Sequence, residues 1–195
     1  MPKDCRKIII SLACVLMLGA GTAEPARADN IVTGSWFTFA WADGSLPITA
    51  TSCLLAFSAG CNFVTQPDAP APPWSITAPV DGLLLTVTDM QTSGDQFRLF
   101  DTAIALGDTA LVSSTAGRCG TDAAACLLSP QHSHGFFLLA EGSHSLTIDV
   151  VSANGGRGGT GAFRLDAAPV PEPATLALLG TGLIGLAAAR RRKSA

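Results

Sequence analysis

The chain has 195 residues, of which 48% are hydrophobic and 14% charged, and its formal net charge at pH 7 is −3. Eight of its 12 basic and three of its 15 acidic residues lie before Asp29 or after Ala168, so the segment between keeps four cations, 12 acids and a net charge of −8. Because such an acidic segment repels phosphate backbones, we expect no nucleic-acid partner.

The first 28 residues have the organisation of a secretory signal peptide. A basic start is followed by an apolar run, Ile8 to Thr22, and then by Ala26 and Ala28, small residues at the two positions that define a cleavage site. We therefore expect the mature protein to begin at Asp29. Cys14, inside the apolar run, leaves a lipoprotein as the alternative.

The segment from 29 to 168 is long enough for one domain with its own core and is predicted to consist of strands. In Ser145–Val151, apolar residues alternate with Thr147 and Asp149, which places Leu146, Ile148 and Val150 on one face. No stretch has convincing helical periodicity. The predicted strands are 36–41, 74–78, 83–88, 97–99, 109–115, 136–140, 145–151 and 161–166.

Many short strands separated by turn residues predict a single antiparallel β-sandwich, jelly-roll-like in topology. Turns are expected at 93–95, at 141–143 and in the glycine-rich stretch 153–161. The proline-rich stretch 66–73 is unsuited to a central strand. We interpret it as a stiff surface loop of the same domain; an interdomain linker is the alternative.

Four cysteines remain after removal of the signal peptide: Cys53, Cys61, Cys119 and Cys126. An even number in an exported chain predicts disulfides, and short loops close most readily, which favours Cys53–Cys61 and Cys119–Cys126. A metal site made by all four thiolates is the alternative, although the usual C-x2-C spacing is missing.

Several polar residues are candidates for chemistry, each with a simpler structural interpretation. On a strand, His132 and His134 would face the same side and could bind one metal, or they belong to a polar loop. Ser133, His144 and Asp149 could be assembled into a hydrolase triad, although no Gly-x-Ser-x-Gly elbow is present.

Binding of calcium or sugar is also considered from the composition. Four aspartates crowd one region and could hold a structural Ca²⁺, or they mark turns: Asp89, Asp95, Asp101 and Asp108. Three tryptophans could stack on sugar rings, or they belong to the core: Trp36, Trp41 and Trp74. We expect no resident cofactor or metal.

A proline-glutamate-proline triplet, an apolar segment and a basic cluster follow one another near the end of the sequence. The triplet comes directly after Val170 as Pro171, Glu172 and Pro173. The apolar segment, Ala174 to Ala189, would form roughly 24 Å of helix, near the lower limit for crossing a bilayer. Four cations that should stay on the cytoplasmic side follow it: Arg190, Arg191, Arg192 and Lys193.

This order of elements resembles the PEP-CTERM sorting signal of exported bacterial proteins, over Val170 to Lys193. The resemblance implies a transient inner-membrane anchor recognised at its Pro-Glu-Pro by an exosortase, a membrane-embedded transpeptidase-like enzyme. It also implies a Gram-negative source that makes exopolysaccharide and biofilm. An ordinary single-span tail anchor is the alternative. The expected organisation is signal peptide 1–28, β-sandwich domain 29–168 and sorting and anchor segment 169–195.

The central segment is also similar to small secreted β-sandwich domains of uncharacterised function. Short motifs carry this similarity: Thr77-Ala78-Pro79, Leu85–Asp89, Gly94-Asp95-Gln96-Phe97, His134-Gly135-Phe136 and Gly142-Ser143-His144-Ser145. It implies no catalytic residues. We expect a non-catalytic cell-surface or extracellular-matrix protein, with exopolysaccharide as a candidate contact. A carbohydrate-binding module is the first alternative and a secreted hydrolase the second.

Overall fold

The computed structural model describes residues 31–42, 44–53, 61, 64–113, 117–153 and 158–169. The predicted signal peptide lies outside these residues, as do the cleavage positions Ala26, Ala28 and Asp29. The tail from Val170 onward lies outside them as well.

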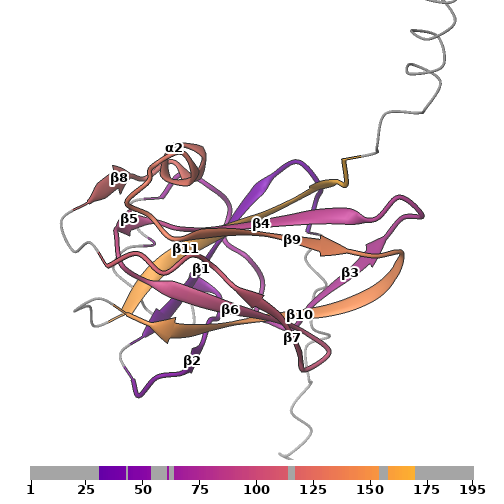
Figure 1. Cartoon of the computed structure of the whole chain (residues 1–195), viewed down its shortest axis with the longest axis horizontal. Coiled ribbons are helices and arrows are strands. Elements are labelled where there is room, and N and C mark those ends of the chain that lie inside the picture. The colour runs from indigo at the N-terminus through magenta and orange to yellow at the C-terminus, as the bar shows by residue number, and fades with distance from the viewer. Residues whose placement is uncertain are drawn as a thin grey trace, which may run out of the picture.

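Two antiparallel sheets pack face to face in the described part of the chain, as Figure 1 shows. The first sheet has the order β1-β11-β4-β9, with the bounds Trp36–Ala42, Gly158–Ala167, Leu83–Asp89 and His134–Leu139. The second has the order β2-β10-β6-β7, with the bounds Ile48–Thr49, Gly142–Ser152, Gln96–Asp101 and Ile104–Asp108. β3, Trp74–Ala78, also pairs with β10.

The chain passes back and forth between the sheets. β1, β4, β9 and β11 belong to the first sheet, whereas β2, β3, β6, β7 and β10 belong to the second. This alternation of antiparallel strands is the jelly-roll arrangement, so the predicted all-β, jelly-roll-like sandwich is confirmed. A small ribbon of β5, Gln91–Thr92, and β8, Arg118–Gly120, lies at one end beside the short helix α2, Ala123–Leu127 (Figure 1).

The core forms because the two sheets turn their period-two apolar faces toward each other. On β10, Leu146, Ile148 and Val150 are buried, whereas Thr147 and Asp149 are half-buried on the opposite face. Aromatic rings fill the centre: the ring of Phe39 meets that of Phe97 edge-on at a centroid distance of 5.2 Å.

Glycines on β11 make room for these rings. A side chain at Gly159 would collide with the ring of Trp41, and one at Gly161 would collide with the ring of Phe39. The glycine-rich stretch predicted as a turn is therefore partly strand, because β11 already begins at Gly158. Glycine is needed here for close packing as well as for turning the chain.

The predicted strand at 109–115 is wrong where the structure describes it, since Thr109–Ser113 is not strand. The strand lies earlier, at β7, and is reached through a tight turn in which Thr102 and Ala103 have φ values of +47° and +67°. Such turns usually carry asparagine or glycine, so their sequence signal is missing here.

The short helix α2 was also missed, because five residues are too few to show a helical period. The Asp122 side chain caps this helix by accepting a hydrogen bond from the Ala124 N–H.

The proline-rich stretch 66–73 lies along the edge of β1 that β11 leaves free. The Thr38 N–H donates to the Pro67 carbonyl oxygen at 2.9 Å, and the Ala69 N–H donates to the Thr38 carbonyl oxygen at 2.7 Å. The Asp68 carboxylate accepts from the Cys53 N–H at 2.8 Å. This stretch is therefore a loop of the same domain, and it covers an edge that would otherwise be open to pairing with other chains.

Candidate functional site

The two histidines expected on one strand face, His132 and His134, do not belong to one strand. β9 begins only at His134, so His132 lies in the preceding turn, where it is fully buried. Its Nδ1 is 2.9 Å from Ser129 Oγ and its Nε2 is 3.4 Å from the Gln91 carbonyl oxygen. Burial lowers the pKa of His132. Because His132 precedes the strand, the period-two argument for a shared metal does not apply to this pair.

His144 is paired with a carboxylate and a carbonyl. Its Nδ1 lies 2.7 Å from Asp101 Oδ2, and its Nε2 lies 2.8 Å from the Ala140 carbonyl oxygen. Both acceptors favour a proton on the nitrogen that faces them, which is the arrangement of an imidazolium. The hydrogen bond to Asp101 accordingly raises the pKa of His144. The contact ties the start of β10 to the end of β6.

The residues of the hydrolase hypothesis each have other partners. Ser133 is buried, and its Oγ lies 2.6 Å from Thr109 Oγ1. Asp149 accepts from the Thr49 hydroxyl at 2.8 Å, while His144 is engaged by Asp101. The structure therefore gives no support to a triad of Ser133, His144 and Asp149.

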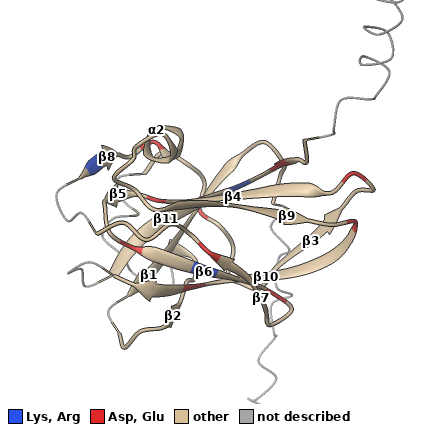
Figure 2. Ribbon diagram, in the orientation of Figure 1, with Lys and Arg blue, Asp and Glu red and all other residues tan. Residues whose placement is uncertain are grey.

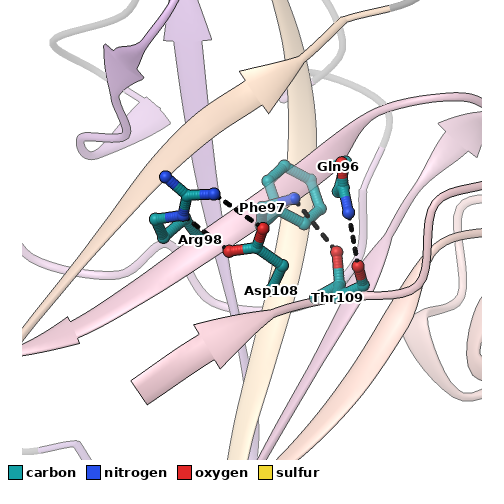
Figure 3. A network of polar contacts seen from close by, with 5 residues as sticks. All are labelled: Gln96, Phe97, Arg98, Asp108 and Thr109. Carbon is teal, nitrogen blue, oxygen red and sulfur yellow. Dashed lines mark hydrogen bonds and ion pairs between the residues drawn. The ribbon is translucent and has the colours of Figure 1, made fainter. Parts of the chain in front are cut away.

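Two of the four aspartates considered for calcium, Asp101 and Asp108, have structural partners on neighbouring strands. Asp108 forms a two-pronged ion pair with Arg98, at 2.7 and 2.8 Å, which joins β6 to β7 (Figure 3). The hydrogen bond from Arg98 lowers the pKa of Asp108. Asp101 holds His144. Within the described residues, no group of three or more His, Cys, Asp or Glu side chains is placed to hold a metal ion.

Next to this ion pair, Thr109 holds the start of β6. Its Oγ1 accepts from the Phe97 N–H at 3.0 Å and its carbonyl oxygen accepts from the Gln96 side chain at 2.8 Å, as Figure 3 shows. Phe97 itself is fully buried. The polar residues of this region thus fix the register of β6 against the chain that follows β7.

Asp89 is a buried acid at the end of β4. Its Oδ2 accepts from the Gly94 N–H at 3.1 Å and from the Asp95 N–H at 3.3 Å, which closes the turn before β6. Its Oδ1 has no hydrogen-bond partner in the described structure. Burial, assisted by the negative charge of Asp95, raises the pKa of Asp89 to about 8. From the sequence, Asp89 was one of four aspartates interpreted as calcium ligands or turn residues, and nothing in the sequence indicated that it is buried.

Two of the three tryptophans considered for sugar stacking lie in the core. Trp41 and Trp74 are 1% and 2% exposed, so neither can offer a ring face to a ligand. Trp36 is half-buried, and the Arg164 guanidinium lies 4.9 Å from the centre of its ring. A sugar platform made of these tryptophans is therefore not present in this fold.

A pocket that sequence reasoning missed lies beside the β5–β8 ribbon. Its lining includes Gln91, Arg118, Gly120 and Thr121. Arg118 is exposed and forms no ion pair with any described residue, unlike Arg98 and Arg164. No motif in the sequence pointed to this place, because its lining residues come from two segments that pair only in the folded chain.

Both predicted disulfides are confirmed. Cys53–Cys61 has a Cα–Cα distance of 5.7 Å and Cys119–Cys126 one of 4.8 Å. The first bond lies beside Ala40 in β1. The second ties β8 to α2, and its Cys126 packs with Met90, Ala123 and Ala162 on the outer side of the first sheet.

Replacing Cys119 and Cys126 together by serine is expected to lower the free energy of unfolding by roughly 2–3 kcal/mol. The loss arises because a short closed loop restricts the unfolded chain, and buried Cys126 would also leave a polar group in apolar surroundings. Urea unfolding of the oxidised protein measures it. Peptide mapping without reductant should find the two pairs; four free thiols in protein taken from outside the cytoplasm would contradict the assignment.

The folded domain ends against a fixed turn. Ala168 is buried, and its N–H donates to the Gly82 carbonyl oxygen at 3.3 Å. Gly82 has a φ of +77°, and its N–H donates to the Pro79 carbonyl oxygen at 2.8 Å, which closes the turn between β3 and β4. A side chain at Gly82 would approach the Leu139 carbonyl oxygen to 2.6 Å, so glycine is required.

The sorting residues predicted from the sequence follow this end of the domain directly. Both groups lie outside the described residues: Val170, Pro171, Glu172 and Pro173 of the triplet region, and Arg190, Arg191, Arg192 and Lys193 of the basic cluster. Among the residues that the structure does describe, no helix has the length and apolar character needed to cross a membrane.

Comparison with known proteins identifies this tail. A family model described as the PEP-CTERM protein-sorting motif matches residues 169–193. The match confirms the sorting signal and marks the chain as an exported surface protein targeted to an exosortase, with a C-terminal membrane-anchoring signal. Comparison with curated proteins and with solved structures found no match.

Proposed function

We propose that this chain is a non-catalytic protein of the cell surface or extracellular matrix that contacts exopolysaccharide after release from its anchor. The observation that carries the proposal is the family match at residues 169–193, which begins directly after the last buried residue of the domain. The polar contacts described above add support, because each candidate catalytic group has a structural partner. The signal peptide exports the chain, and the tail then anchors it in the inner membrane until an exosortase cuts near Pro171–Pro173.

The charge of the domain bears on which polysaccharide it would contact. Asp29 to Ala168 carries a net charge of −8, and Figure 2 shows acidic residues on many elements and basic ones on few. An acidic surface repels polyanions, so neutral or amino-bearing glycans are the better partners. A binding module that stacks sugars on Trp41 and Trp74 is disfavoured because both rings are buried.

The mass of the protein recovered from cells tests the processing part of this proposal. We expect a single species that begins at Asp29 and ends near Pro173, because Ala26 and Ala28 define one cleavage position and Pro171-Glu172-Pro173 the other. An N-terminal sequence that begins at lipid-bearing Cys14 would contradict the first cleavage. Recovery of the chain with Ala174 to Ala189 attached would contradict the second.

Neutralising the basic cluster tests the sorting signal separately. Replacing Arg190, Arg191, Arg192 and Lys193 by glutamine removes the charges that hold one end of the apolar segment on the cytoplasmic side, so the anchored and processed fractions should fall. Replacing Arg118 by glutamine is the matched control and should leave sorting intact, because Arg118 is an exposed cation that forms no ion pair with any described residue. Unchanged localisation of the tail variant would count against the proposal.

Glycan binding is tested with the released protein. Saturable binding to isolated exopolysaccharide from the producing cells is expected, and it should weaken when the polysaccharide is made more anionic. Absence of binding to the cells' own polysaccharide would remove this part of the proposal and leave the sorting part standing.

A further inference from the structure

Large apolar side chains are exposed at the end of the domain that precedes the sorting motif. Val80, in the turn between β3 and β4, is 74% exposed, and Phe136 and Leu138 on β9 are 57% and 66% exposed. Leu84, the cross-strand neighbour of Leu138, is half-buried. These four residues are called the terminal face below. None of them belongs to the core. On β4 and β9 the core is filled instead by the alternate positions Leu83, Leu85, Phe137 and Leu139.

The strand register places the terminal face beside the start of the sorting motif. Asp166 on β11 is opposite Leu84 on β4, which is in turn opposite Leu138 on β9. Leu138 therefore lies two strand spacings, about 10 Å, from the strand that leads into the motif. Val80 lies in the turn whose Gly82 accepts from the Ala168 N–H.

Almost no chain separates this face from the Pro-Glu-Pro triplet. The family match begins at Pro169, one residue after buried Ala168, and the triplet occupies 171–173. Five residues, 169–173, span at most about 18 Å even when fully extended. A single helix with its side chains is about 10–12 Å thick. An enzyme that encloses the triplet must therefore touch this end of the folded domain.

Charge distinguishes an enzyme from the membrane surface as the occupant of this face. Asp81 in the β3–β4 turn and Glu141 in the β9–β10 turn are exposed, and Figure 2 shows acidic residues at the tips of both turns. Asp166 is paired with Arg164 at 2.8 Å, so that cation is already neutralised. An acidic rim lacks the basic residues that attract a protein to lipid headgroups, and together with the apolar patch it complements an apolar protein surface with basic neighbours.

We propose that the terminal face, Val80, Leu84, Phe136 and Leu138, is a docking surface for the exosortase that processes this chain, so that the folded domain helps the enzyme to select its substrate. The inference rests on the proposed processing by an exosortase. Burial of exposed Phe and Leu side chains against the enzyme raises its affinity for the anchored chain. Processing then depends on the domain as well as on the triplet.

Processing of the full chain in the producing cells, followed by pulse-chase, tests this inference. The variant Phe136→Ser with Leu138→Ser is expected to be processed roughly tenfold more slowly, since each change removes apolar contact area. Both side chains point away from the core, so the fold should persist, and an unchanged melting temperature of the released domain would verify it. Leu128→Ser is the matched control, because Leu128 is 83% exposed after α2, away from the motif, and should be processed at the normal rate.

A spacer of about ten Gly and Ser residues between Ala168 and Pro169 provides a second measurement. Docking predicts slower processing, because the spacer uncouples the triplet from the terminal face. Faster processing would show that the domain obstructs the enzyme and would overturn the inference, as would a normal rate for the double serine variant. Lipid adducts alone from a photoreactive residue at position 138 would assign the face to the membrane instead.

The outcomes separate this inference from the proposed function. If Pro171→Ala with Pro173→Ala abolishes processing while the double serine variant is processed normally, the exosortase proposal stands and the docking surface is wrong. If the proline variant is processed at the normal rate, processing by recognition of the triplet fails, and the docking inference fails with it.

Discussion

Replacing Ile148 by aspartate is expected to unfold the domain at room temperature. Ile148 is 2% exposed at the centre of β10, opposite Leu99, and belongs to the core between the two sheets. Loss of its apolar contacts alone corresponds to roughly 2–5 kcal/mol, and burying a carboxylate without a partner adds several more. The free energy of unfolding of a domain of this size is only about 5–15 kcal/mol. This one change is therefore expected to remove most or all of the stability.

Thr147→Asp is the matched control for this prediction. Thr147 is the next residue along β10, half-buried on the opposite face of the sheet, opposite Phe100. A charge there stays in contact with water, so the loss should be about 1 kcal/mol or less. Thermal unfolding of the Asp29–Ala168 fragment, followed by circular dichroism, measures both. Equal destabilisation by the two changes would contradict the period-two assignment, and a helical spectrum would contradict the fold.

Asp89→Asn is expected to make the protein more stable than the parent at high pH, by an amount that shrinks as the pH falls. Burial raises the pKa of Asp89 to about 8 in the folded protein, whereas an unfolded aspartate titrates near 4. Between these values the folded state holds one proton more than the unfolded state. The stability contributed by protonated Asp89 is therefore complete below about pH 4 and lost as the pH rises toward 8, at roughly 1.4 kcal/mol per pH unit.

The expected difference between the parent and the asparagine variant at alkaline pH is therefore several kcal/mol, with roughly 6 as the upper bound. Asparagine stays neutral, and its oxygen can still accept from the Gly94 and Asp95 N–H groups. Urea midpoints at about pH 5, 7 and 9 measure the effect. Asp81→Asn, in an exposed turn, is the control for loss of one negative charge. Parallel pH profiles for the parent and Asp89→Asn would show that Asp89 is not a buried neutral acid.

Local signals in the sequence were enough to predict most of the strands and both disulfides. The alternation around Ile148 identified β10 and its buried face, because a strand turns successive side chains to opposite sides regardless of what it packs against. Sequence separations of only eight and seven residues predicted the cysteine pairing for a similar reason, since closing a short loop depends little on the rest of the fold. The sorting motif was recognisable because its order of elements is linear in the chain.

Strands without a local signal were the ones misplaced. β7 is exposed at the edge of its sheet. The turn before β7 places Thr102 and Ala103 at positive φ, where glycine or asparagine would have indicated a turn in the sequence. The pairing of β6 with β7, and the Arg98–Asp108 contact between them, hold this turn in place. Tertiary contacts, which the local pattern does not contain, therefore decided its position.

The sequence by itself determined that this is an exported all-β protein with a C-terminal sorting signal, because the sorting motif, period-two alternation and short disulfide loops are all read along the chain. Only the tertiary structure decided which polar residues became buried and what lies beside the motif. Asp89 is buried and His144 is paired with Asp101 because segments distant in the sequence cover them. The pairing of β11, β4 and β9 likewise places Leu138 two strands away from β11, which leads into the motif, since positions in a sheet depend on register rather than on distance along the chain.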